Sequence, residues 1–91
     1  MDCAGGKWGD YGCDGGLQHN AFYYWETNYP ETEADYPYTG KDGTCSYDSS
    51  KTAGVKVNNY MFGLQENPDS MKSALEKQPI SVSLEADQAV F

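Results

Sequence analysis

The sequence predicts an α+β fold, because two segments have helical spacing or capping and two others have the character of strands. An amphipathic helix is expected over residues 17–28, where apolar side chains recur at four-residue spacing. A second helix is expected after Asn67, since this residue can cap a helix N-terminus and Pro68 suits the first helical position. Strands are expected at 55–60, with two valines on one face, and at 80–85, where apolar and polar residues alternate.

The segments around the first helix read as irregular structure. Residues 1–16 hold six glycines and no apolar periodicity, which predicts a loop. Pro30 ends the helix, and two Tyr-Pro steps with a Lys-Asp-Gly turn predict a long ordered or tethered loop over 30–51. The chain stops at Phe91 without a closing element after the last strand, so we expect an internal fragment of a longer protein.

Composition excludes several partners. Fourteen acidic against six basic residues give a net charge of −8, which would repel a nucleic-acid backbone. No stretch approaches the roughly 18 apolar residues of a membrane span, and nothing resembles a signal peptide, so no membrane partner is expected. With 91 residues and 38% apolar content, the chain can bury at most one small core.

The cysteines are odd in number: Cys3, Cys13 and Cys45. One pair and one remaining thiol is the simplest arrangement. A disulfide would indicate an oxidising compartment, and the third thiol would then have a partner outside this chain. Three free thiols in a cytosolic protein remain the alternative on composition alone.

The motifs for phosphate and metal binding are incomplete, so no cofactor and no metal are expected. The GGKW stretch at 5–8 lacks the leading glycine and the hydroxyl residue of a phosphate loop. Asp10 and Asp14 fit a calcium loop, but its twelfth position is Ala21, which offers no carboxylate. The three cysteines and His19 could supply four zinc ligands, yet their spacing contains no ligand pair typical of zinc sites.

The Gly15–Gly16 pair precedes the first helix directly. Glycine has no Cβ, so another backbone can approach it, and an extended peptide could pair with such a segment; a tight turn is the simpler interpretation of the spacing. Cys13 and His19 could form a nucleophile and its base. We instead expect an exposed helical His19, because Cys13 stays in the loop ahead of that helix.

Four motifs together give the chain a likeness to a known family. They are DC at 2–3, YGCDGGLQHNAF at 11–22, YPETEADYPYTGKDGTC at 29–45 and QPISVSLEA at 78–86. In this order and at these distances they resemble the middle section of papain-like cysteine peptidases, most closely the cathepsin L-like group. The likeness covers nearly the whole chain.

The resemblance implies a partial papain-like fold, in which a helical left domain packs against a β-barrel-like right domain. Residues 1–60 would belong to the left domain and residues 61–91 would begin the right domain. The resemblance also implies that Cys3 pairs with Cys45, closing a loop of about 43 residues that is worth up to ~4 kcal/mol in the chain-entropy description. Cys13 would pair with a cysteine outside this chain, and the protein would be lysosomal or extracellular.

The resemblance further implies where a peptide would bind. Gly16 would offer its backbone N–H and C=O to the substrate residue two positions before the scissile bond. Asp14, where asparagine is common in the family, and the polar Gln18 and Ser83 mean that a purely apolar pocket is not expected. The remaining substrate-binding residues implied for the next subsite and the specificity pocket are Tyr11, Gly15, Leu17, Gln18 and Ser83.

The family's catalytic cysteine, histidine and asparagine have no counterpart here, since Cys3, Cys13 and His19 do not match those positions. We therefore expect a fragment of a cysteine endopeptidase that binds polypeptide substrates but is inactive alone. Two alternatives stay open: a non-catalytic binding or storage homologue, and a small interaction module stapled by a disulfide.

Overall fold

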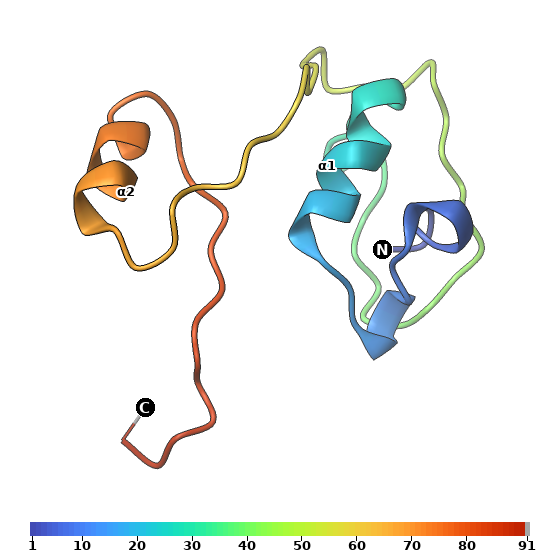
Figure 1. The fold of residues 1–91 in the computed structure, drawn as a ribbon. Helices are drawn as coiled ribbons and strands as arrows, with labels where there is room; N and C mark the ends of the chain where they lie inside the picture. The colour runs from blue at the N-terminus through green and yellow to red at the C-terminus, as the bar shows by residue number, and fades with distance from the viewer. Residues whose placement is uncertain (91) are drawn as a thin grey trace. The chain divides into compact units, whose positions relative to one another are not determined.

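The computed structural model of the chain describes residues 1–90 and contains two α-helices and two short 3-10 helices. They are η1 (Gly6–Trp8), η2 (Gly12–Asp14), α1 (Gln18–Thr27) and α2 (Pro68–Leu75). The chain divides into two compact units, Met1–Met61 and a second unit that begins at Phe62 (Figure 1). The assignment of these units to a left and a right domain stays a prediction.

Helix α1 confirms the helix expected from the apolar spacing. It begins after Leu17, whose backbone is extended, and the Asn28 N–H donates to the Tyr24 carbonyl at 3.1 Å where it ends. The ring of Trp8 in η1 lies edge-on to Tyr23 and Tyr24, with centroids 5.0 and 5.2 Å away. Edge-on aromatic pairs are favourable beyond their buried area. These contacts hold η1 against α1 in the first unit.

The segment after α1 is the long tethered loop that the sequence predicts. At its base, the Ala53 N–H donates to the Pro30 carbonyl at 2.7 Å, beside an isolated bridge between Glu31 and Thr52. The disulfide between Cys3 and Cys45, with Cα atoms 4.8 Å apart, ties the far part of the loop to the start of the chain. This is the pair that the family resemblance implied.

Polar contacts around Asp2 reinforce the disulfide. One carboxylate oxygen accepts the Gly43 N–H at 3.0 Å, and the other accepts the Tyr36 hydroxyl at 2.9 Å. The same hydroxyl oxygen accepts the Ser46 N–H at 2.9 Å. Since hydrogen bonds to a charged group are stronger than neutral ones, Asp2 fixes the loop on both sides of Cys45.

The two predicted strands are absent, which corrects the β part of the α+β expectation. Residues 55–60 and 80–85 have no regular secondary structure, and the described part of the chain contains one isolated bridge and no strand. A strand forms when a neighbour takes up its backbone N–H and C=O groups, and no other described segment does so here. Val82 and Leu84 remain 51% and 65% exposed.

Helix α2 confirms both of its predicted start signals. The Asn67 side chain accepts the Ser70 N–H at 2.9 Å, and Pro68 occupies the first turn, where its missing N–H costs nothing. Met71 and Leu75 are exposed on this helix. Neither described helix has the length and apolar character needed to cross a bilayer.

Burial is slight throughout residues 1–90. Ala4, at 5% exposed, is the one buried residue among them, so the small core that the composition permits does not form. The first unit is therefore held by its disulfide, its ring contacts and its backbone hydrogen bonds rather than by a packed interior.

Reducing the disulfide should loosen the loop around Cys45 because the loop has no core to hold it. We expect faster hydrogen exchange at the Gly43 and Ser46 amides, whose acceptors are Asp2 and Tyr36. The Ser70 amide of α2 serves as the internal control and should not change. Equal exchange at Gly43 in the oxidised and reduced chains would contradict this role of the disulfide.

Candidate functional site

Five of the six predicted substrate-binding residues lie in one continuous stretch, residues 11–18, here called the docking segment. It runs from the residue before η2 to the first residue of α1. The sixth, Ser83, is exposed and belongs to the second unit. The five that share the docking segment are all exposed: Tyr11, Gly15, Gly16, Leu17 and Gln18.

Main-chain hydrogen bonds close the first part of the docking segment into a tight turn. The Tyr11 N–H donates to the Gly15 carbonyl at 2.8 Å, and the Gly15 N–H donates to the Gly12 carbonyl at 3.3 Å. Gly12 and Gly15 have φ angles of +59° and +115°, which residues with a Cβ rarely adopt. Of the Gly15–Gly16 pair, Gly15 therefore belongs to a tight turn, together with Gly12.

Gly16 differs from both of them. Among residues 1–90, no hydrogen bond uses its backbone N–H or C=O, so both groups are available to a ligand. A Cβ at this position would lie 2.5 Å from the Asp10 Oδ1 atom and 2.6 Å from its Cγ atom. Any side chain at position 16 would therefore require the Asp10 carboxylate to move.

From its sequence context, Asp10 is expected only as part of an incomplete calcium loop. Its Oδ1 atom accepts the Leu17 N–H at 2.8 Å and the Asn20 side-chain amide at 3.1 Å. Leu17 is the N-cap residue of α1 and supplies no side-chain cap of its own. A carboxylate here satisfies a donor at the start of the helix and interacts favourably with the positive end of its dipole.

Asp42 reaches the docking segment from the loop that Cys45 anchors. Its Oδ1 atom accepts the Cys13 N–H at 2.7 Å, although 29 residues separate the two. The same carboxylate occupies the space that a Cβ on Gly12 would need. No local pattern could have revealed this contact, because the partners are distant in sequence.

Cys13 is a free, exposed thiol, and its Sγ atom lies 3.8 Å from the Met1 Sδ atom. Loss of hydration beside neighbouring protein atoms raises the pKa of this thiol. The nearby Asp42 carboxylate, which accepts the Cys13 N–H, raises the pKa further, and so do the negative charges of Asp14 and Asp2. A raised pKa reduces the thiolate fraction, so the site opposes a nucleophilic role for Cys13.

His19 is half-buried in α1 rather than exposed as expected, because its ring lies beside Tyr60 with centroids 6.1 Å apart. No hydrogen bond joins it to Cys13 in the described part of the chain. Within the same residues, no group of three or more His, Cys, Asp or Glu side chains could hold a metal ion.

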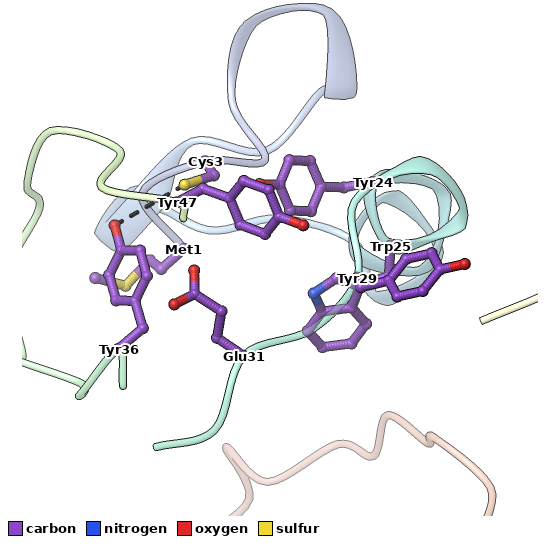
Figure 2. A pocket seen from close by; sticks show the side chains of 8 residues that line it. All are labelled: Met1, Cys3, Tyr24, Trp25, Tyr29, Glu31, Tyr36 and Tyr47. Carbon is purple, nitrogen blue, oxygen red and sulfur yellow. Dashed lines mark hydrogen bonds between the residues drawn. The ribbon is translucent and has the colours of Figure 1, made fainter. Parts of the chain in front are cut away.

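Two surface hollows lie elsewhere in the first unit and include none of the predicted substrate-binding residues. One, of about 180 Å³, places the Glu31 carboxylate among tyrosine rings beneath Cys3 (Figure 2). That carboxylate accepts the Asp48 N–H at 3.1 Å, which indicates a structural role. The other, of about 350 Å³, lies along the loop anchored by the disulfide and is lined by Asp2, Asp35, Tyr36, Pro37, Thr39, Lys41, Asp42, Gly43 and Ser46.

Comparison with known proteins agrees with the motifs. The family model described as papain family cysteine protease matches residues 1–91. The chain is 41% identical to thiol protease aleurain of Arabidopsis thaliana over 87 residues, which are 93% of this chain and 24% of that protein. It is 36% identical to a cathepsin L-like protein of Caenorhabditis elegans and to cathepsin S of Bos taurus, with all of this chain covered and 27% and 28% of those proteins.

The chain therefore spans about a quarter of the length of the curated relatives it matches. No solved structure shows a significant match.

Replacing Asp42 with asparagine should make Cys13 more reactive in this chain. The asparagine side chain would keep an oxygen acceptor for the Cys13 N–H but remove the negative charge that raises the thiol pKa. A lower pKa means more thiolate at a given pH, so iodoacetamide should alkylate Cys13 faster in Asp42→Asn, at about pH 8. Asp48→Asn is the matched control, because Asp48 does not contribute to the pKa of Cys13. Identical pH profiles of alkylation for wild type and Asp42→Asn would refute the influence of Asp42.

Proposed function

Since this chain belongs to the papain family of cysteine proteases, we propose that it is the middle section of a cathepsin L-like endopeptidase that hydrolyses peptide bonds. In this proposal the chain supplies substrate-binding subsites and no catalytic group. The observation that carries it is the unpaired backbone of Gly16 within a stretch whose sequence matches the family. An extended peptide could hydrogen-bond to that N–H and C=O as an added strand.

The neighbouring residues would contact substrate side chains on either side of this backbone pairing. Gly15 and Tyr11 would border the subsite one residue further from the scissile bond. Tyr11 is 74% exposed, so its ring is free to lie against a ligand. Leu17, 58% exposed, and Gln18 would form part of the specificity pocket. Ser83 is proposed, on the family resemblance alone, as a further substrate-binding residue. The polar Gln18 would let the pocket accept polar side chains as well as apolar ones.

Catalysis would come from residues that this chain does not contain. The family reaction is attack of a cysteine thiolate on a peptide carbonyl, followed by hydrolysis of the acyl-enzyme with a histidine as base. Cys3 is bonded to Cys45, and the raised pKa of Cys13 disfavours its thiolate, so neither suits the role of nucleophile. Cys13 would instead pair with a cysteine elsewhere in the complete protein, in a lysosomal or extracellular setting that permits disulfides.

The chain alone should show no peptidase activity. Incubated with casein or a fluorogenic peptide, it should release product at the rate of buffer. Turnover that survives repurification and is blocked by a thiol alkylator would mean that one of its own cysteines is catalytic, contrary to this proposal.

In the complete protease, Gly16→Val should raise KM by roughly tenfold or more, because a side chain that meets Asp10 would shift the Gly16 backbone and weaken its two hydrogen bonds to the substrate. Gly63→Val is the control, since a Cβ at Gly63 meets open space without backbone strain. Stability is measured in parallel, because a side chain at position 16 also displaces Asp10. An unchanged KM for Gly16→Val would remove this glycine from the substrate-binding site.

A further inference from the structure

The docking segment is poorly supported by packing. All of its residues except Gly12 are exposed, and its internal hydrogen bonds stop at Gly15. A flexible binding edge loses conformational entropy when it orders on a ligand, which weakens binding. An edge that offers the backbone of Gly16 to a peptide therefore needs support from residues outside the segment.

Asp10 provides this support at the Gly16 end. Its Oδ1 atom takes the N–H of Leu17, the residue immediately after Gly16, and its carboxyl carbon would lie 2.6 Å from a Cβ on Gly16. The Asn20 side chain donates to the same oxygen, so α1 itself fixes the orientation of the carboxylate. Because Asp10 faces the Cα of Gly16 and binds its neighbour, it limits rotation of the Gly16 peptide groups.

Asp42 provides the same kind of support at the other end. Its Oδ1 atom takes the N–H of Cys13 at 2.7 Å while its carboxylate fills the Cβ space of Gly12. The neighbouring Gly43 donates its N–H to the carboxylate of Asp2. Asp2 directly precedes Cys3, which forms the disulfide. The Asp42 carboxylate thus connects the docking segment to the loop that the disulfide holds.

We propose that Asp10 and Asp42 are positioning residues that hold the docking segment in its peptide-binding conformation. Each carboxylate accepts one backbone N–H and occupies the side-chain space of one glycine, Gly16 or Gly12. This inference rests on the proposed function, since it assigns the support of the same binding edge. The new element is that Gly12 and Gly16, which have no side chains, leave space for the two carboxylates, while the backbone of Gly16 stays available to the peptide.

The geometry also predicts which property of the two side chains matters. The three hydrogen bonds donated by Leu17, Asn20 and Cys13 all end on an Oδ1 atom. Asparagine keeps such an oxygen and has nearly the shape of aspartate, so it should preserve the support without the charge. Alanine removes the acceptor and leaves an unfilled space beside the glycine.

The test compares kcat and KM of the complete protease on one fluorogenic peptide for Asp10→Ala, Asp42→Ala, Asp10→Asn and Asp42→Asn. We expect each alanine variant to raise KM roughly tenfold with a smaller change in kcat, and each asparagine variant to restore KM to within about threefold. Asn67→Ala is the matched control, because it removes a comparable N-terminal cap from α2, which belongs to the second unit. It should lower stability without changing KM.

Two outcomes would overturn the inference. One is an unchanged KM in both alanine variants, which would leave the carboxylates with a structural role alone. The other is a KM that rises as much with asparagine as with alanine. If Asp10→Ala does not fold, Asn20→Ala removes one bond to Asp10 and should raise KM by a smaller factor; an unchanged KM there and in Asp42→Ala counts against the inference.

Failure of the proposed function looks different. In that case the complete protein cleaves no peptide, or Gly16→Val leaves KM unchanged, before any aspartate is altered. Normal turnover and a KM that responds to Gly16→Val but not to Asp10→Ala or Asp42→Ala would reject the positioning role alone.

Discussion

The disulfide between Cys3 and Cys45 joins the beginning of the chain to the far part of the loop that follows α1. Residues 1–90 bury almost nothing but Ala4, so the conformational entropy of this loop is not offset by apolar burial. Closing the loop covalently reduces the entropy of the unfolded chain instead. Asp2 and Tyr36 then form hydrogen bonds with the backbone on either side of Cys45. These bonds can form because the disulfide already holds the loop close to the start of the chain.

The constraint reaches the candidate site through the order of residues near Cys45. Asp42 and Gly43 are neighbours, and each takes part in one hydrogen bond that crosses from the loop to the start of the chain. The shape of a protease subsite built on residues 11–18 would therefore depend on the disulfide, which does not itself contact the substrate. Family membership supplies the proposed chemistry, whereas the arrangement of carboxylates against glycines comes from this chain's own contacts.

Local signals in the sequence were sufficient for the helices. The Asn67-Pro68 pair and the apolar spacing after Leu17 act within a few residues, and both helices form where these signals place them. The predictions of strands at 55–60 and 80–85 were wrong. Alternation of apolar and polar residues describes the two faces of a strand but does not indicate a neighbouring strand to pair with. For the same reason, half-burial of His19 beside Tyr60 was missed.

The candidate site, like the fold, was only partly predictable from local sequence signals. The glycine pair and its neighbours could be proposed as site residues because they are contiguous and match a family motif, while the cysteine count alone left the pairing open. Asp42 could not be found, since its contact with Cys13 spans 29 residues, and Asp10 was read as an incomplete metal ligand. Both contacts depend on where a loop folds back, which neither spacing nor composition specifies.

The junction of Pro30 with Ala53 has a consequence for how such a chain tolerates change. The two ends of the loop that follows α1 meet through one main-chain hydrogen bond of 2.7 Å, beside the isolated bridge between Glu31 and Thr52. Residues added or lost between that junction and the anchor at Cys45 would alter the contour of the loop while its entry and exit stay fixed. Changes in the length of this loop are therefore expected to leave α1 and its exposed side chains in place.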